Sequence, residues 1–341
     1  MPDATLQILQ NLRDDGQRLF GDRTLDFDVL HSSEREASTV AKVAIRTGRG
    51  TETVFVKVFK PRHNTATALS ETRDRVARDF EFSSRLHAAF SASNTFSVVR
   101  PIACYPEHLA IVTAESAGTT LLDVLERRAT WWPSGLVRRD LEATHSNVGG
   151  WLSAFQRVEP TNNELSLDAM REYIDIRVRR LLMTSPPVLD QSARARVLDY
   201  FDRTAAAVDA ADRTEVLTHA DLAPSNILID GDRVTVIDFA MVAPGGRYMD
   251  LARLYTQLEF LKAKPKFRPS VVAALQRGLL RGFDPSLTPD RPLFQLFVLQ
   301  HLLCHMSNIA RNPAPLLARL YNRHQLRLRQ RWLHALAAEA A

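Results

Sequence analysis

Alternating apolar and polar residues in the first third of the chain predict a small sheet with one helix. Residues 23–61 alternate as three strands, and the run TGRGTET forms a hairpin loop between the second and the third. Residues 68–90 place apolar side chains at helical spacing, and residues 96–116 alternate as two more strands. Together with a helical segment at the N-terminus, this order predicts a small α+β lobe.

From residue 119 onward the apolar periodicity is mostly helical. Two short β-like runs, NILID and VTVID, interrupt it, and the turn Asp230-Gly231-Asp232 joins them. We expect a small hairpin inside a helical region. The predicted fold class is α+β, with an N-lobe over residues 1–112, a connecting segment at 113–118 and a larger, mainly helical C-lobe over 119–341.

The composition is that of an ordinary globular protein. A chain of 341 residues with 45% hydrophobic content is long enough to bury one large core or two smaller ones. Cys104 and Cys304 lie far apart, so the sequence predicts neither a disulfide framework nor a zinc knuckle. The N-terminus lacks the pattern of a secretory signal, and the longest apolar stretch, Leu293–Met306, is too short and too polar to span a bilayer. We therefore expect a cytoplasmic protein.

The net charge of +5 is unevenly distributed along the chain. Residues 251–341 contain 14 Lys and Arg against 4 Asp and Glu, whereas the first 250 residues contain 30 against 35. A basic C-terminal region attracts anions, although a solvated surface accounts for such a bias equally well.

The stretch THADLAPSNILIDGDRVTVIDF, residues 218–239, carries the residue types of phosphoryl transfer. Its spacing H-x-D-x-x-x-x-N places His219, Asp221 and Asn226 before the hairpin, and Asp238 follows the last apolar run. Transfer from a nucleotide needs a carboxylate that orients the attacking hydroxyl, and oxygen ligands that hold Mg²⁺ against the phosphates. Asp221 supplies the first, and Asn226 and Asp238 supply the second. Turn and cap chemistry is the alternative explanation for Asp and Asn in such a loop.

This stretch resembles the aminoglycoside phosphotransferase and choline kinase families, which have the protein-kinase-like fold. The resemblance rests on HADLAPSN, VIDF and MDLARL and spans roughly residues 54–254. It implies a bilobal fold with a hinge at 113–118, ATP (or GTP) and Mg²⁺ as cofactors, a catalytic loop at 219–226 with His219 and Asp221, and a metal-binding strand end at 237–239. It also implies that Asp250 braces the catalytic loop, with ordinary helix capping as the alternative.

A kinase of this type also needs a lysine on its third strand, and the run VFVKVF supplies Lys57. On strand alternation Lys57 shares a face with Phe55, whose ring is a candidate for stacking on adenine and equally for core packing. We expect the partner of the lysine to be Glu81 on the following helix, with Glu71 as the fallback. Backbone groups from Thr113 to Glu115 are expected to hydrogen-bond the base.

Three features depart from the kinase pattern. The segment HSSEREAST between the first two strands lacks the G-x-G-x-x-G run that lets the backbone approach phosphates. Ala220 stands where regulated protein kinases carry arginine, and Ala240 replaces the glycine after Asp-Phe. Eleven residues separate Asp238 from Asp250, without an A-P-E motif, so little chain is left to dock a peptide. A small-molecule or glycan hydroxyl is the better acceptor.

The basic C-terminal region narrows the acceptor further. Polycationic acceptors such as aminoglycosides suit carboxylate-rich sites, so the charge of residues 251–341 favours a neutral or anionic acceptor. Residues 314–341 read as one long helix, which could lie on an anionic membrane or pack with a solvated basic face. Its leucines and arginines are Leu316, Leu317, Leu320 and Leu328, and Arg319, Arg323, Arg327, Arg329 and Arg331. The chain has no aromatic and basic module of the kind that binds nucleic acid.

The predicted function is an ATP- and Mg²⁺-dependent O-phosphotransferase that acts on a hydroxyl of a small molecule, sugar or glycan. One alternative is a kinase of a membrane-associated glycolipid or lipopolysaccharide-type acceptor. Another is a pseudokinase that binds without turnover, which the absent glycine loop and Ala240 favour and the intact Asp221, Asn226 and Asp238 oppose. Adenylyl transfer is a third alternative, which no residue demands.

Overall fold

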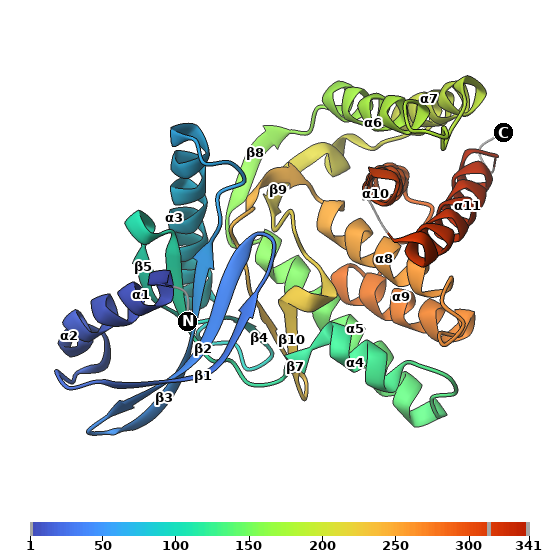
Figure 1. Ribbon diagram of the computed structural model, residues 1–341. Coiled ribbons are helices and arrows are strands. Elements are labelled where there is room, and N and C mark those ends of the chain that lie inside the picture. Colours follow the sequence, from blue (N-terminus) through green and yellow to red (C-terminus); the bar gives the residue numbers. More distant parts are fainter. Residues whose placement is uncertain (1–2, 312–314, 339–341) are drawn as a thin grey trace. The chain divides into compact units, whose positions relative to one another are not determined.

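The computed structural model describes residues 3–311 and 315–338, which fold as two compact units (Figure 1). The first contains Met1–Asp123 together with Pro224–Val242, and the second contains Val124–Ala223 together with Ala243–Ala341. Strands dominate the first unit and helices the second, so the predicted α+β class is confirmed. The division itself differs from our expectation, because the first unit extends past residues 113–118 and includes the hairpin that we placed in the helical region.

The first unit is built on an antiparallel sheet in the order β1-β2-β3-β6-β5. The three strands and the helix occur as predicted, but residues 96–116 contain three strands and not two, because a short strand at 96–98 joins a second sheet. The hairpin loop is reduced to Gly48 and Arg49. The elements are α1 (Asp3–Asp14), α2 (Gly16–Phe20), β1 (Asp26–Glu34), β2 (Ser38–Thr47), β3 (Gly50–Phe59), α3 (Ala66–Ala89), β5 (Pro101–Tyr105), the 3-10 turn η1 (Pro106–His108) and β6 (Ala110–Ala114).

Period-two alternation along β3 separates a packed face from a functional face. Val54 and Val56 are fully buried in a core cluster that also contains Ile8 of α1. Phe55 and Lys57 point to the opposite face and are half-buried, as the alternation predicts. Burial of the apolar face thus stabilises the sheet, and the opposite face can carry a lysine without disturbing that core.

A second sheet in the first unit contains the predicted hairpin. Its order is β4-β11-β10-β7, with β4 (Phe96–Val98), β7 (Thr119–Thr120), β10 (Ile227–Asp230) and β11 (Arg233–Val236). β11 pairs in parallel with β4, and β10 pairs antiparallel with β7. These two pairings join strands more than 100 residues apart in the sequence. They explain why the hairpin belongs to the first unit.

The second unit is mostly helical. Its helices are α4 (Leu121–Arg128), which begins at the end of the first unit, α5 (Gly135–Gln156), α6 (Leu167–Leu182), α7 (Gln191–Ala206), α8 (Met249–Leu261), α9 (Pro269–Phe283), α10 (Pro292–Arg311) and α11 (Leu316–Ala338). A small antiparallel sheet has the order β12-β9-β8, with β8 (Pro160–Glu164), β9 (Thr214–Thr218) and β12 (Ala243–Gly246), and a 3-10 turn η2 (Ala210–Arg213) precedes β9. Ser166 caps α6, because its hydroxyl accepts a hydrogen bond from the Ala169 N–H at 3.1 Å.

α5 and α9 pack with their backbones in direct contact. A methyl group added at Gly149 of α5 would overlap the carbonyl oxygen of Leu279, and one added at Gly282 of α9 would overlap that of Ser146. Glycine is therefore required at these positions by the closeness of the two helices.

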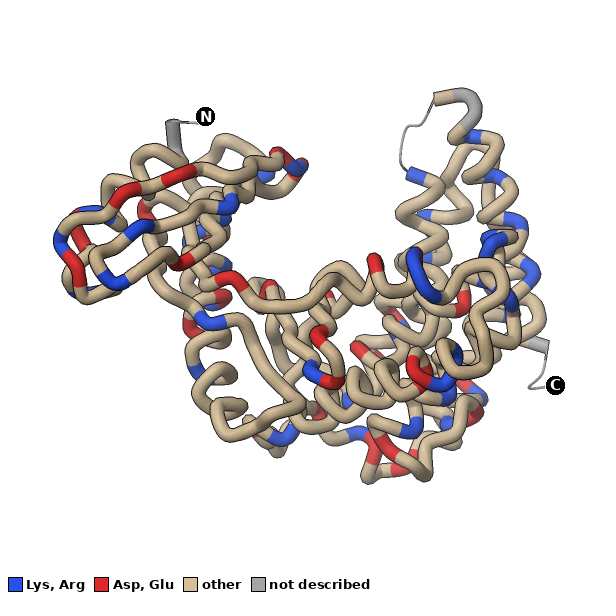
Figure 2. Tube along the Cα trace, turned by 90° about the horizontal axis from the view of Figure 1, so that it is seen from below, with Lys and Arg blue, Asp and Glu red and all other residues tan. Residues whose placement is uncertain are grey.

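The last two helices, α10 and α11, contain the longest apolar stretch and the basic segment that the sequence singles out. Within the described ranges, α10 alone is long and apolar enough, by length and composition, to cross a membrane, but 56% of its apolar window is buried inside the protein. That burial is typical of a core helix. Basic positions recur along the C-terminal helices (Figure 2).

α11 confirms the long helix but not its expected faces. Leu320 is 55% exposed, whereas Arg329 is 5% exposed. Arg329 donates to the His305 Nδ1 at 3.1 Å and lies 4.2 Å from the centre of the Phe260 ring. Burial lowers its pKa to about 10. The buried stripe of α11 thus includes an arginine that we had placed on a solvated face.

Candidate active site

The first unit joins the predicted strand lysine to the predicted metal ligand. Lys57 of β3 lies 2.8 Å from the Oδ1 of Asp238, and its ammonium group lies 4.4 Å from the centre of the Phe59 ring. Both partners of the ion pair are partly solvent-exposed. The structure therefore brings together two residues that are 181 positions apart, as the kinase interpretation requires.

The hairpin places Asn226 and Asp238 at the same end of the second sheet. Ile227 pairs with Val236 in the antiparallel register, and the Ile237 N–H donates to the Asn226 carbonyl oxygen at 3.1 Å. Asn226 ends the 3-10 turn η3 (Pro224–Asn226) that enters β10. The two residues that we predicted as metal ligands are thus held by one short ladder.

The expected partner of Lys57 is corrected by the structure. Glu81 lies on the exposed face of α3, with 66% of its side chain exposed, and its carboxylate lies 3.9 Å from Arg85. The carboxylate that α3 buries near Lys57 and Asp238 is Asp79. Helix register decides this, because the buried stripe of α3 runs through Val76, Asp79 and Ser83 and excludes position 81.

Asp79 is 3% exposed and has defined partners. Its Oδ1 accepts the Phe239 N–H at 2.9 Å and the Ser83 hydroxyl at 3.4 Å. Burial raises its pKa to about 6, against the opposing effect of Lys57, and the nearby charge of Asp238 adds to the rise. Asp79 therefore fixes the backbone directly after Asp238 and adds negative charge beside Lys57.

The residues predicted to bind the base are partly used by the sheet. Phe55 pairs with Thr113, and its ring lies 5.9 Å from the ammonium group of Lys42. The Glu115 N–H donates to the Thr53 carbonyl at 2.9 Å, and the Glu115 carboxylate pairs with Lys42 at 2.6 Å. Base recognition by Phe55, Thr113 and Glu115 stays a prediction, in which the Glu115 N–H is already occupied.

The turn between β1 and β2, where the glycine loop is missing, is tied to the end of β3. The Lys60 ammonium donates to Glu34 at 2.5 Å and to the Arg35 carbonyl at 3.2 Å, and its N–H donates to the Ala37 carbonyl at 2.9 Å. Three contacts from one lysine thus hold a turn that has no glycine.

The second unit contains the first part of the predicted catalytic loop, residues 219–223, and its brace. β9 leads directly into His219, which is fully buried. Both carboxylate oxygens of Asp250, in the first turn of α8, accept backbone N–H groups, from His219 at 2.6 Å and from Ala220 at 3.0 Å. Burial raises the pKa of Asp250, and the His219 side chain and these two hydrogen bonds oppose the rise. Bracing by Asp250 is therefore confirmed, and it accommodates a left-handed Ala220 with φ of 60°.

Arg253 is a contact of the catalytic loop that the sequence interpretation missed. One turn after Asp250 on α8, its guanidinium donates to the Asp221 Oδ1 at 2.5 Å and to the Ala220 carbonyl at 3.2 Å. The signal was present in the run MDLARL, because residues 250 and 253 share a helix face. The Asp221 side chain remains 45% exposed to solvent.

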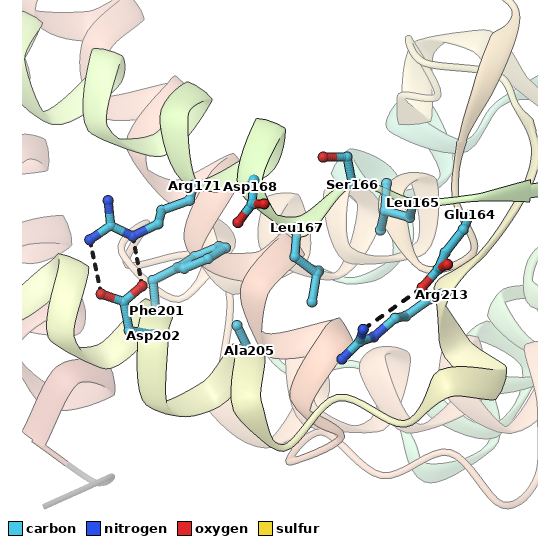
Figure 3. A pocket seen from close by; sticks show the side chains of 10 residues that line it. All are labelled: Glu164, Leu165, Ser166, Leu167, Asp168, Arg171, Phe201, Asp202, Ala205 and Arg213. Atoms are coloured by element: carbon cyan, nitrogen blue, oxygen red, sulfur yellow. Dashed lines mark hydrogen bonds and ion pairs between the residues drawn. The ribbon is translucent and has the colours of Figure 1, made fainter.

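A cavity of about 450 Å³ lies elsewhere in the second unit, between β8, α6 and α7 (Figure 3). Arg171 donates to both oxygens of Asp202 at 2.6 and 2.9 Å, and Arg213 lies 3.7 Å from Glu164. None of the predicted site residues lines this cavity.

Comparison with known proteins assigns the family. The sequence profile described as the phosphotransferase enzyme family (APH) matches residues 36–291. The chain belongs to this family. A search of curated protein sequences found no match.

Solved structures of other proteins have a fold similar to that of this phosphotransferase. The crystal structure of aminoglycoside phosphotransferase APH(4)-Ia has a TM-score of 0.58 at 15% identity and covers 100% of both chains. Ethanolamine kinase from Plasmodium vivax has a TM-score of 0.52 at 11% identity, with 96% of this chain and 88% of that chain covered. A GDP complex of aminoglycoside 2'-phosphotransferase-IIIa has a TM-score of 0.53 at 13% identity, with 98% and 97% covered. The predicted kinase-like fold is confirmed, and the chain is a kinase with an alcohol group as acceptor.

The donor set of this phosphotransferase fits Mg²⁺ bound together with a nucleotide. Groups of three or more His, Cys, Asp or Glu that could form a metal cage do not occur among residues 3–311 and 315–338. One amide and one carboxylate at a hairpin end suit a hard cation that takes its remaining ligands from phosphate and water. Asp238 has φ of 70°, a strained conformation for a non-glycine residue, and such strain is typical of functional positions.

Proposed function

We propose that this protein transfers the γ-phosphoryl group of ATP to a hydroxyl of a neutral or anionic small molecule, sugar or glycan. Asn226 and Asp238 would hold Mg²⁺, which when bound supplies positive charge against the phosphates. Lys57 positions the phosphates, and Asp79 keeps the backbone after Asp238 in place. Asp221 orients the acceptor hydroxyl and accepts its proton.

One observation carries this proposal, which is the 2.8 Å ion pair between Lys57 and Asp238. If Lys57 only covered its strand, it would not be expected to pair with the carboxylate after the hairpin. If Asp238 served only the turn, it would not be expected to pair with the lysine of the sheet. Their pairing is expected if both contact the same polyphosphate when it binds.

The class of acceptor follows from charge. Neighbouring structures contain hygromycin B or kanamycin, both in aminoglycoside kinases. The region from residue 251 to the end of this chain carries 14 Lys and Arg against 4 Asp and Glu, which repels a polycationic acceptor. A sugar, a phosphorylated metabolite or another acceptor without amino groups suits this charge better.

The test is Mg²⁺-dependent ADP release with a panel of sugars, sugar phosphates, amino alcohols and aminoglycosides. Asp221→Asn should lower kcat by roughly 10²- to 10⁴-fold, because it removes the group that accepts the proton. Asp199→Asn is the matched control, since Asp199 lies exposed on α7 and pairs with Arg203. Turnover of Asp221→Asn equal to that of Asp199→Asn would refute the assignment.

A further inference from the structure

Two tryptophans project into solvent from the connection between α4 and α5. Trp131 is 59% exposed and Trp132 is 71% exposed, and Leu136 in the first turn of α5 is 76% exposed. The two indole rings stack at 6.3 Å between centres. Single exposed apolar residues are ordinary, but three large ones within six positions form an exposed apolar patch, which is typical of an interaction site. We call residues 130–133 the tryptophan loop.

The structure holds the tryptophan loop in place despite an unfavourable backbone. Trp131 has φ of 59°, in the left-handed region that a bulky residue rarely adopts. Its N–H donates to the Lys266 carbonyl at 2.6 Å, and Thr130 forms a bridge with Phe267. The loop is thus fixed to the connection between α8 and α9, and an exposed, strained and well-anchored tryptophan points to a function.

The surroundings of the tryptophan loop are basic. The guanidinium of Arg268 lies 4.5 Å from the centre of the Trp132 ring, and Lys264 and Lys266 both pair with Glu126. Residues 126–140 and 259–268 together contain eight Lys and Arg against three Asp and Glu. The three acids, Glu126, Asp140 and Glu259, are already paired with Lys or Arg, so the surplus charge is positive.

We propose that the tryptophan loop docks this protein on an anionic phospholipid surface. Tryptophan prefers the membrane interface, where the ring meets the acyl boundary and its N–H meets water. Lys and Arg around it attract anionic head groups, and the attraction falls with salt. Exposed apolar side chains together with nearby cations are the combination that binds such a surface. The tryptophan loop belongs to the connection between α4 and α5 and not to the basic helix α11.

Vesicle flotation and tryptophan emission test the proposal. The full-length protein should float with phosphatidylcholine vesicles that contain a third of phosphatidylglycerol, and its emission should shift to the blue, whereas pure phosphatidylcholine should give neither. Trp131→Asn combined with Trp132→Ser should lower the bound fraction at least fivefold, because it removes both indole rings from the exposed patch. The variant should remain folded, since asparagine tolerates the left-handed backbone at position 131. Arg268→Gln should lower it about fivefold, as expected for one cation at an anionic surface.

Two controls make the outcome decisive. Met183→Ser removes another apolar residue, 82% exposed, and Arg319→Gln with Arg323→Gln removes cations from α11. Both should bind vesicles as the wild type does. Equal binding by the tryptophan variant, loss of binding only in the α11 variant, or no binding by the wild type would each overturn the proposal. A dimer in light scattering that only the tryptophan variant loses would assign the patch to a second copy instead.

Discussion

At the scale of one residue, Arg253 holds the carboxylate of Asp221, the aspartate that we propose as catalytic, in position. It contacts both Asp221 and the carbonyl of Ala220, so it fixes the carboxylate and the peptide before it. A charge-assisted hydrogen bond of this kind is shorter and about twice as strong as a neutral one. Under the proposed function, the acceptor hydroxyl would reach Asp221 through the part of its side chain that is exposed to solvent.

We predict that Arg253→Met lowers kcat by about 10- to 100-fold while the KM for ATP changes little, because the residues that we propose for the nucleotide belong to the other unit. Steady-state ADP release measures both constants. Arg277→Met, on the exposed surface of α9, is the control. A rise in the KM for ATP without a fall in kcat would show that Arg253 serves the nucleotide and not Asp221.

Asp79 predicts a pH dependence whose sign follows from its raised pKa. The folded-state pKa is about 6 and the reference value is 3.8, so the folded protein binds more protons than the unfolded chain between these values. This group therefore stabilises the fold fully below pH 3.8 and loses that contribution as the pH rises through 6. The loss amounts to about 3 kcal/mol for a shift of about two pH units.

Asp79→Asn keeps the acceptor for the Phe239 N–H and removes the titration. Urea unfolding should show the wild type losing about 2 kcal/mol relative to the variant between pH 4.5 and 7.5. Parallel stability curves would contradict the raised pKa. The same variant should bind ATP less tightly at neutral pH, since Lys57 then lacks one of its two carboxylates.

At the scale of one residue, the motif could be predicted from the sequence, but the register of α3 could not. Lys57, Asp221, Asn226 and Asp238 stand in runs whose spacing is diagnostic, so their positions were readable. The choice between positions 79 and 81 depends on which face of α3 is buried. Counting three residues on from the buried Val76 leads to Asp79, yet an acidic residue is an unexpected member of an apolar stripe.

Helices and hairpins could be predicted as elements, but the strands with which they pair and the helices against which they pack could not. The hairpin of β10 and β11 follows from a local turn, whereas its pairing with β4 and β7 depends on contacts across more than 100 residues. The buried Arg329 of α11 could not be predicted for a related reason. Its neighbours Phe260 and His305 come from other helices, and periodicity alone assigns an arginine to solvent.

The contact between α5 and α9 gives a prediction at the scale of elements. Gly282→Ala would drive a methyl group into the Ser146 carbonyl, so the two backbones have to separate and repack. We expect a loss of about 2–4 kcal/mol in the free energy of unfolding, in the range of severe overpacking. Gly135→Ala, where nothing lies within 4 Å of the added methyl group, is the control and should change it by less than about 1 kcal/mol.

Denaturant unfolding of both glycine variants measures the difference. Kinetics of ADP release in native buffer should remain close to the wild type in both, because neither glycine belongs to the candidate site. Equal stability of Gly282→Ala and Gly135→Ala would mean that the two helices can part at no cost.

For the whole molecule, the two units divide between them the residues that we propose for the nucleotide and for the acceptor. Lys57, Asp79, Asn226 and Asp238 belong to the first unit, and Asp221, Asp250 and Arg253 belong to the second. The chain crosses from one to the other between Ala223 and Pro224, within the catalytic loop. Binding of the nucleotide and activation of the acceptor are therefore expected to respond to different substitutions.

We predict that Mg²⁺ with a non-hydrolysable ATP analogue slows amide hydrogen exchange in β3 and in the hairpin of β10 and β11. At a hundredfold excess over its Kd a ligand stabilises the state that binds it by about 2.7 kcal/mol, which is ample for detection. Lys57→Met should abolish this protection, whereas Lys262→Met, a lysine of the second unit that pairs with Glu259, should retain it. Asp221→Asn should also retain it, although its turnover is lost. Protection that survives in Lys57→Met, or that disappears in Asp221→Asn, would contradict the division of labour, because the nucleotide would then depend on the residues of the acceptor half.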